Sequence, residues 1–257
     1  MDYFAGIDVG SSSTEAVILD ANSEMAGYSI VETGANSTEA AEQAMAQALS
    51  ETGIDREEVK GSVATGYGRI SVPFARKKVT EISCHGRGAY HLFPGTGTVI
   101  DIGGQDSKVI RIGEGGKVLD FTMNDKCAAG TGRFLEVMSS KLKIPMEQMG
   151  RLSLESGGAL KISSVCTVFA ESEVVSLVAQ NRPKGEIVHG LHRAIVNRVW
   201  NMVKAVGIHG DMVMSGGVAK NRGVVSLLEA KAGASFFIHE EPQIVGALGA
   251  ALFAQEL

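Results

Sequence analysis

The sequence predicts an α/β protein made of two similar halves around a shared cleft. Apolar runs of strand length alternate with longer segments in which apolar residues recur at helical intervals. One pattern also occurs twice: an apolar run that ends in Asp-x-Gly, a turn rich in small residues, and a second apolar run. A repeat of this kind indicates an internal duplication. The alternative is a chance coincidence of two Asp-x-Gly turns, because the motif is short.

The first copy lies at the start of the chain and predicts a hairpin. The apolar run Tyr3–Val9 is followed by Gly10, by four hydroxyl residues, and then by a second apolar run, Ala16–Leu19. The tip of such a hairpin presents backbone N–H groups and hydroxyls. The elements expected next are a helix over Ala40–Leu49 (capped by Asn36 or Ser37 and ended by Gly53), a strand over Val59–Thr65 and a helix over Thr80–His91.

The second copy joins the apolar run Thr98–Ile102 to a strand over Lys108–Ile110. Aligned on Asp8 and Asp101, both copies place a Gly two residues later and a hydroxyl residue six residues later. Those hydroxyl residues are Thr14 and Ser107. We therefore expect each half to present one hairpin to the cleft.

The rest of the chain adds one more glycine turn and three helices. In Met212–Asn221 a strand runs into Ser-Gly-Gly and a helix start, which lets backbone approach a ligand closely. Helices are expected over Val168–Gln180, Glu186–Val206 and Ile244–Phe253. The apolar face of the longest is most simply core. Its His189 and His192 could share a metal ion, but partners within the protein are the simpler interpretation.

Composition excludes several classes of protein. The chain has 257 residues, 44% hydrophobic and 21% charged, which is ordinary for a globular protein. A net charge of −5 does not indicate the basic surface with which proteins bind nucleic acid. We find neither a membrane-spanning run nor a signal peptide, so no membrane association is expected. Three cysteines do not make a secreted disulfide framework, and the reduced cytoplasm is the expected compartment.

The two hairpins suit phosphate chemistry. Gly/Ser turns form anion-binding concavities from their backbone N–H groups. The carboxylates that end the strands, Asp8 and Asp101, can hold Mg²⁺ through water, because Mg²⁺ dehydrates reluctantly. Neither a P-loop nor a GxGxxG fingerprint occurs in the chain.

Two cysteines, Cys127 and Cys166, each precede a helix-like run. A thiol at a helix N-terminus favours the thiolate, which acts as a nucleophile, a redox centre or a metal ligand. A small buried hydrophobe is the alternative for a lone cysteine, and it is the interpretation adopted for Cys84.

These motifs carry a resemblance to known proteins. DVGSSSTEAVI, DIGGQDSKVI and MSGGVAKN resemble the phosphate and adenosine segments of the actin, sugar-kinase and heat-shock chaperone ATPases. NDKCAAGTGRFLE, SSVCTVFAESEV, ATGYGR, EISCHGRGA and GALGAAL resemble more closely the activator ATPases of 2-hydroxyacyl-CoA dehydratases. Their family includes the ATPase subunits of benzoyl-CoA reductase and the reductases of double-cubane-cluster proteins. The resemblance covers nearly the whole chain.

The resemblance implies two actin/ribonuclease-H-like domains and a homodimer with one [4Fe–4S] cluster. Residues 1–94 would form the N-terminal half, completed by the helix at 243–257, and residues 95–242 the half with the cluster cysteines. Each subunit would contribute Cys127 and Cys166, which agrees with the four thiolates that such a cluster usually takes. ATP binding and hydrolysis would drive a low-potential electron to a partner enzyme.

The resemblance also implies roles for the nucleotide residues. Asp8 and Asp101 would hold the Mg²⁺–phosphate end of ATP or ADP, and Gln105 would orient the attacking water. The remaining nucleotide contacts would come from Gly10, Ser12, Ser13 and Thr14, from Gly103 and Gly104, and from Gly216, Gly217, Lys220 and Asn221. His85 and Arg69 lie in matching motifs without an assigned role.

The partners implied are a cluster-containing dehydratase, a reductase or a double-cubane protein as electron acceptor, and a ferredoxin or flavodoxin as donor. Two other functions stay open on the residues alone. One is a small-molecule kinase of the same superfamily with structural cysteines. The other is a non-redox, nucleotide-sensing ATPase with Zn²⁺ in a Cys₄ site.

Overall fold

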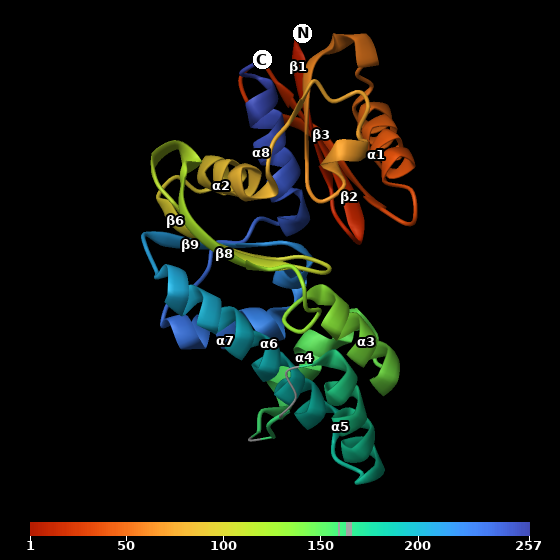
Figure 1. Cartoon of the computed structure of the whole chain (residues 1–257), viewed down its shortest axis with the longest axis vertical. Coiled ribbons are helices and arrows are strands. Elements are labelled where there is room, and N and C mark those ends of the chain that lie inside the picture. Colours follow the sequence, from red (N-terminus) through yellow and green to blue (C-terminus); the bar gives the residue numbers. More distant parts are fainter. Residues whose placement is uncertain (159, 163–165) are drawn as a thin grey trace.

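The computed structural model describes residues 1–158, 160–162 and 166–257 and contains two mixed sheets (Figure 1). The first sheet has the order β3-β2-β1-β4-β5, and the second has the order β8-β7-β6-β9. The strands of the first sheet are β1 (Tyr3–Val9), β2 (Ser13–Asp20), β3 (Met25–Glu32), β4 (Val59–Thr65) and β5 (Lys77–Lys78). Those of the second are β6 (Thr96–Ile102), β7 (Ser107–Ile112), β8 (Val118–Asn124) and β9 (Asp211–Ser215).

The two sheets repeat one topology. In each, a central strand pairs antiparallel with the next strand along the chain and parallel with a strand that follows a helical connection. The turns are also equivalent, because Gly10 N donates to Ser13 O and Gly103 N donates to Asp106 O, both at 3.0 Å. The two predicted hairpins are therefore confirmed, and the repeated Asp-x-Gly pattern is a real structural repeat.

The helices connect and cover these sheets. In the first half they are α1 (Ser37–Thr52), between β3 and β4, and α2 (Glu81–Leu92). Between β8 and β9 lie α3 (Gly132–Leu142), α4 (Met146–Ser156), α5 (Thr167–Ala179) and α6 (Lys184–Val206), followed by α7 (Arg222–Ala232) and α8 (Val245–Ala254). Short 3₁₀ turns occupy Arg56–Glu58, Arg69–Ser71, Glu114–Gly116, Gly217–Lys220 and Pro242–Ile244.

Local chemistry explains the limits of α1. The Asn36 side chain accepts a hydrogen bond from Glu39 N, which satisfies one of the free donors at the helix start. Gly53 ends the helix with a φ of 69°, in the left-handed region that glycine tolerates best. Of the two predicted caps, Asn36 is the correct one.

The last helix, α8, packs on the first sheet and on α2. A Cβ on Gly6 of β1 would overlap the carbonyl oxygen of Ala247, and one on Gly249 would overlap that of Cys84. Backbone therefore meets backbone at both contacts, and glycine permits this approach. The C-terminal segment thus lies beside the N-terminus (Figure 1), while the proposed domain limits stay a prediction.

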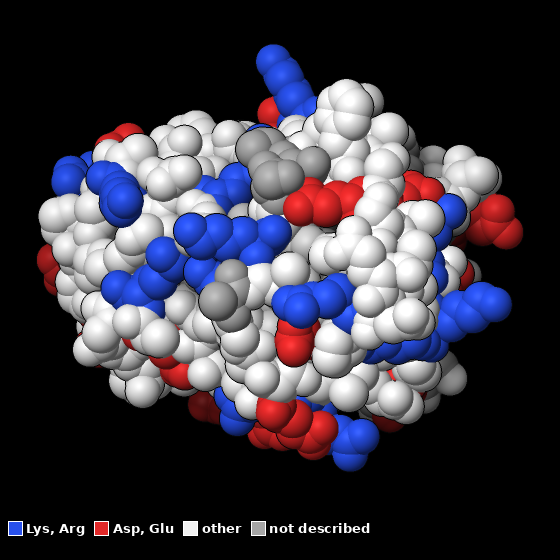
Figure 2. All heavy atoms as spheres, turned by 90° about the horizontal axis from the view of Figure 1, so that it is seen from below, with Lys and Arg blue, Asp and Glu red and all other residues white. Residues whose placement is uncertain are grey.

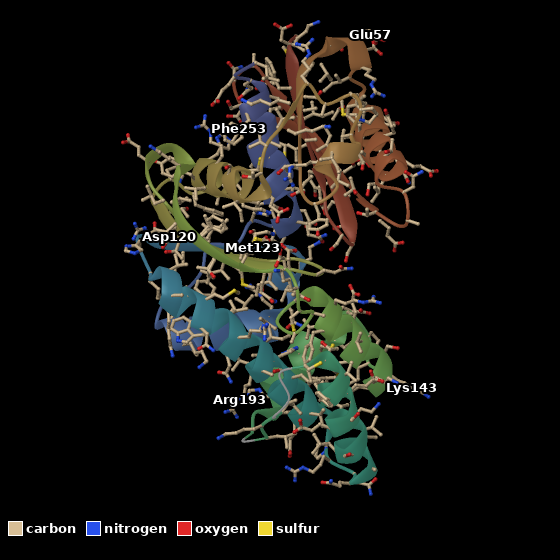
Figure 3. The ribbon with its side chains drawn as sticks, in the orientation of Figure 1. Glu57, Asp120, Met123, Lys143, Arg193 and Phe253 are labelled. Carbon is tan, nitrogen blue, oxygen red and sulfur yellow. The ribbon has the colours of Figure 1, made fainter. Side chains whose placement is uncertain are left out.

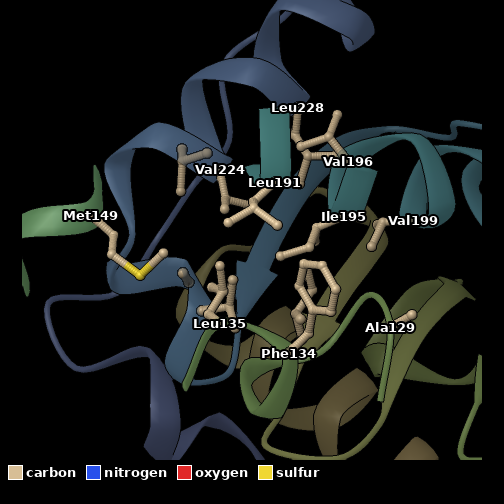
Figure 4. Packing of buried hydrophobic residues seen from close by; sticks show 14 of the residues in the cluster. Ala129, Phe134, Leu135, Met149, Leu191, Ile195, Val196, Val199, Val224 and Leu228 are labelled. Carbon is tan, nitrogen blue, oxygen red and sulfur yellow. The ribbon is translucent and has the colours of Figure 1, made fainter. Parts of the chain in front are cut away.

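The largest hydrophobic cluster fills the second half around α6 (Figure 4). Phe134 and Leu135 of α3 point toward Leu191 and Ile195 of α6, and α7 closes the other side. The apolar face that the helical spacing predicts for α6 is confirmed as core, although one of its residues, Met202, is only partly buried; the face consists of Ile187, Leu191, Ile195, Val199, Met202 and Val206. Among the described residues, the chain has no helix with the length and hydropathy to span a membrane.

Candidate functional site

A cavity of about 930 Å³ lies between the two sheets and is lined by residues from both. Met123 of β8, labelled near the middle of Figure 3, is one of these residues. All the predicted nucleotide residues except Thr14 line it: Asp8, Gly10, Ser12, Ser13, Asp101, Gly103, Gly104, Gln105, Gly216, Gly217, Lys220 and Asn221. The structure therefore brings together residues that are separated by more than half of the sequence.

Thr14 is fully buried instead, and its hydroxyl lies 2.9 Å from that of Thr33. Side chains alternate along a strand, so Ser13 and Glu15 of β2 reach the cavity while Thr14 points to the other face of the sheet. The Thr14 hydroxyl therefore does not face the cavity.

The two hairpin turns meet across the cavity. A Cβ on Gly104 would overlap the Ser12 side chain, so the tips of the two hairpins face each other closely. Gln105 is exposed at the tip of the second turn. A third turn follows β9, where Gly216 has a φ of 81° and a Cβ would overlap the carbonyl oxygen of Ile102. Three backbone turns thus converge on one space, as close approach to a phosphate chain requires.

His85 of α2 lies between the two strand-end aspartates. Its Nε2 is 3.9 Å from Asp8 Oδ2 and its Nδ1 is 3.6 Å from Asp101 Oδ1. Ser215 of β9 donates to Asp101 Oδ1 at 2.8 Å and lies 3.4 Å from His85 Nδ1. The imidazole therefore lies between the two aspartates that end the central strands of the two sheets.

The aspartates differ in the residue that faces each of them across its hairpin. Asp8 pairs in register with Glu15, whereas Asp101 pairs with Lys108. The Lys108 ammonium lies 2.9 Å from Asp101, forms a close ion pair with Asp106 and lies 3.5 Å from Glu81 of α2. The duplication thus places an acid in one copy where the other has a base.

The carboxyl pKa values of the two aspartates shift in opposite directions. Burial raises the pKa of Asp8 to about 6, and Glu81 and Asp101 add to the effect while His85 and Lys108 oppose it. Burial would also raise the pKa of Asp101, but His85 and Lys108 outweigh it and hold that pKa well below its usual range. Burial and the Asp8 charge raise the pKa of Glu15 well above normal.

The far side of the cavity is formed by the helices of the second half. Asn221 caps α7 by accepting from Gly223 N and Val224 N, and its amide nitrogen lies 3.3 Å from His192 Nε2. Burial lowers the pKa of His192 to about 4, so the ring is neutral and Nε2 accepts from Asn221. Residues of α3 and α4 that the sequence did not predict also line this side: Leu135, Glu136, Met146, Glu147, Gly150, Arg151 and Leu154.

His189 and His192 do not converge on one metal ion. His189 Nδ1 lies 3.2 Å from the Ser153 hydroxyl, whereas His192 faces Asn221. The simpler interpretation, in which each histidine has a partner within the protein, is confirmed. Arg69 has a structural contact as well, because its guanidinium donates to Gly66 O at 2.8 Å, beside Asp8.

The start of α3 is hydrogen-bonded to the second hairpin turn. Gly132 N donates to Gly103 O at 2.8 Å, and Arg133 N donates to Gly104 O at 2.7 Å. These are N–H groups that an α-helix leaves without intrahelical partners. The segment that begins with Cys127 is therefore attached to the turn that faces the cavity.

The three cysteines occupy different environments. Cys84 is buried and burial raises its thiol pKa to about 12, as suits a structural thiol. Cys166 is exposed and is the N-cap of α5, which confirms its expected place at a helix N-terminus. Residues 163–165 of its motif lie outside the described residues.

Cys127 is half-buried and lies before the helix, not at its first turn. α3 begins at Gly132 with Thr131 as its N-cap, because a turn intervenes in which Thr131 N donates to Ala128 O and Gly130 has a φ of 94°. The expected position of this thiol at the helix N-terminus is therefore wrong. Asn124 instead holds the loop by donating to Cys127 O at 2.8 Å.

Comparison with known proteins places this chain in a family. The model of the BadF/BadG/BcrA/BcrD ATPase family matches residues 5–254. The (R)-2-hydroxyglutaryl-CoA dehydratase activating ATPase of Acidaminococcus fermentans is 44% identical over 253 residues, which are 98% of this chain and 96% of that protein.

Solved structures agree with the family match. The activator of 2-hydroxyisocaproyl-CoA dehydratase from Clostridium difficile, with bound ADPNP, has a TM-score of 0.94 and 41% identity, covering 99% of this chain and 94% of that one. A ROK family glucokinase from Streptomyces griseus shares the fold alone, with a TM-score of 0.57 and 15% identity over 99% and 100% of the two chains. These likenesses confirm the predicted fold of the actin and sugar-kinase type. The chain belongs to the BadF/BadG/BcrA/BcrD ATPase family.

Proposed function

We propose that this protein is an ATP-driven activator that passes single low-potential electrons to a partner enzyme of the 2-hydroxyacyl-CoA dehydratase type. Its relatives are named as activators of such dehydratases. Two hydrogen bonds in the structure support the proposal most directly. Gly132 N donates to the carbonyl of Gly103, and Arg133 N donates to the carbonyl of Gly104. They connect the cavity turn directly to the helix that follows Cys127.

In this proposal the cavity holds ATP with Mg²⁺. Asp8 and Asp101 bind the ion through water, and the backbone N–H groups of the two hairpin turns hold the phosphates. Gln105, at the exposed tip of the second turn, orients the attacking water. The adenosine lies toward Gly216, Gly217 and Asn221, where Gly216 allows close backbone approach.

The cysteines fit a cluster shared between two copies of the chain. Cys166 is exposed at the N-terminus of α5, so its sulfur can be reached by a second copy of the chain. Within the described part of one chain, no three His, Cys, Asp or Glu residues form a group that could hold a metal ion. Cys127 and Cys166 of two subunits would supply the four thiolates of one [4Fe–4S] cluster, which stores the transferred electron when bound.

The surface of α5 supports dimer formation next to this site. Val168 and Phe169, in its first turn, are each 68% exposed, and Val175 is 54% exposed. Large exposed apolar side chains on one helix indicate a protein interface. Figure 2, seen from the lower end of Figure 1, also shows Lys and Arg side chains gathered across this end of the molecule between acidic ones.

We propose a ferredoxin or flavodoxin as the electron donor and a dehydratase, reductase or double-cubane protein as the electron acceptor.

Anaerobic purification tests the proposal. We expect a brown homodimer with about four irons per dimer, an EPR signal after reduction with dithionite, and ATP hydrolysis. A colourless protein that phosphorylates a sugar or an acid would instead be a kinase. A dimer that holds zinc and gives no EPR signal would be a non-redox ATPase.

A further inference from the structure

Gln243 lies where the chain returns from the second half to α8, and it lines the cavity. Its side chain spans the two halves. The amide nitrogen donates to Ser13 Oγ in the first hairpin turn at 3.2 Å, and the amide oxygen accepts from Lys220 Nζ, after β9, at 2.7 Å. The backbone N–H of Gln243 is fixed as well, because it donates to Glu241 Oε1 at 3.2 Å.

The chemistry of the partners fixes which way the amide points. An ammonium group can only donate, so Lys220 must face the oxygen of Gln243, which leaves the nitrogen for Ser13. Since that nitrogen donates to Ser13 Oγ, the single hydroxyl hydrogen of Ser13 is free for Glu15 Oε1, which lies 2.5 Å away. Lys220 also pairs with Glu241 at 2.8 Å. One directed chain of hydrogen bonds therefore runs from Lys220 through Gln243 and Ser13 to Glu15.

We propose that Gln243 is a positioning residue for the nucleotide: it holds the Ser13 hydroxyl of one half and the Lys220 ammonium of the other in a fixed relation across the cleft. This inference rests on the proposed binding of ATP in the cavity. Because both side chains are already ordered before the nucleotide arrives, nucleotide binding does not lose the conformational entropy that ordering them would otherwise cost. No feature of the sequence spacing identifies Gln243, because its role depends on which side chains it meets across the cleft.

The chain offers a matched control for a substitution at this position. Gln255, twelve residues later, also ties the C-terminal segment to a turn by two side-chain hydrogen bonds: its amide nitrogen donates to Asp20 O at 2.8 Å and its oxygen accepts from Ser23 Oγ at 2.9 Å. It does not line the cavity. Gln243→Met and Gln255→Met therefore remove similar bridges, one inside the proposed site and one outside it.

Isothermal titration of ADPNP with Mg²⁺ into the purified dimer, with steady-state hydrolysis of ATP, tests the inference. We expect binding about tenfold weaker for Gln243→Met, because two directed bonds are lost, and unchanged for Gln255→Met. The KM for ATP rises while kcat changes little, as for uniform binding. Ser13→Ala combined with Gln243→Met should weaken binding by less than the sum of the two single effects, because both variants break the Gln243–Ser13 hydrogen bond.

Several results would overturn the inference. One is an ADPNP affinity of Gln243→Met equal to that of Gln255→Met. Another is a double variant in which the losses of binding free energy from Ser13→Ala and Gln243→Met simply add. If Gln243→Met does not fold, Gln243→Glu replaces it, because glutamate keeps the side-chain shape and the acceptor for Lys220 but loses the donor to Ser13. Normal ADPNP affinity in Gln243→Glu would also contradict the inference. Failure of the unmodified protein to bind ADPNP would reject the proposed nucleotide site itself.

Discussion

Asp8 and Asp101 occupy equivalent positions in the two hairpins, yet their surroundings shift their pKa values in opposite directions. Because burial raises the pKa of Asp8 from 3.8 to about 6, its charged form opposes folding at neutral pH. One pKa unit corresponds to about 1.4 kcal/mol. We expect Asp8→Asn to raise the free energy of unfolding by about 2–3 kcal/mol at pH 8, measured in urea without Mg²⁺ or nucleotide.

The pH dependence of this effect has a definite sign. The penalty is absent below pH 3.8, grows as the pH rises toward about 6 and is constant above it, so at pH 5 the gain should fall to about half. Asp101→Asn should instead destabilise the protein by about 3–5 kcal/mol, because it leaves the buried Lys108 with less countercharge. Equal destabilisation by both variants at pH 8 would contradict this account.

Gln105 allows a separate test of the chemical step. Its side chain is exposed at the turn that faces the cavity, so its replacement should not disturb the core. If it orients the attacking water, Gln105→Ala lowers kcat for ATP hydrolysis by about a hundredfold while ADPNP affinity stays the same. Gln47→Ala, at an exposed position on α1, is the control. Hydrolysis at the normal rate in Gln105→Ala would exclude this role.

The sequence predicted the residues of this site that lie in turns, because glycines and strand-end aspartates have a recognisable spacing. It did not predict Glu15, Lys108, His85 or Gln243 as site residues. Glu15 and Lys108 each face the cavity because they pair in register with an aspartate, a relation that depends on the strand register. The places of His85 and Gln243 depend on how α2 and the Pro242–Ile244 turn pack against both halves, which no local pattern encodes.

Glycines determine the contact between the helices α2 and α8. A Cβ on Gly249 would overlap backbone atoms of Cys84, and one on Gly88 would overlap Val245 O. In an isolated helix Gly→Ala stabilises by up to about 1 kcal/mol. Here Gly249→Ala should destabilise by about 1–3 kcal/mol, because backbone on both sides must move. Thermal unfolding measures this effect.

Gly113 provides the comparison for Gly249. A Cβ at Gly113 would meet only side-chain atoms of Leu119, at 3.3 Å or more, and Leu119 is 54% exposed and can move aside. Gly113→Ala should therefore change the melting temperature little. A melting temperature in Gly249→Ala at or above that of the unmodified protein would show that α2 and α8 can separate without penalty.

The elements that the sequence predicted are those with strong periodicity or a continuous apolar run, such as β1, β6 and α6. The strands β3 and β8 escaped prediction because each lies at the edge of its sheet and exposes several residues. The helix α4 begins after Pro145 and buries only Met149, Gly150 and Ser153, so its apolar signal is weak. Elements that bury few residues therefore give a periodic signal too weak to predict them.

At the scale of the whole molecule, the duplication gives two turns that meet at one cavity, and the helices α3 to α6, which follow β8, distinguish the halves. The second hairpin turn is bonded to the start of α3, and α3 packs against α5. Cys127 precedes the first of these helices and Cys166 caps the second. A change at the second hairpin turn therefore has a short route to both proposed cluster ligands, through hydrogen bonds to α3 and the packing of α3 on α5.

Dimerisation and cluster binding should then fail together when one of these ligands is removed. Each subunit would supply two of four thiolates, so Cys166→Ala deletes two ligands per dimer and should give a monomeric protein without iron. Cys84→Ala is the matched control, because this thiol is buried and its pKa of about 12 keeps it protonated. Anaerobic size-exclusion chromatography with light scattering and iron analysis measure both properties. A dimer with a full complement of iron in Cys166→Ala would require other ligands and would remove α5 from the route between nucleotide and cluster.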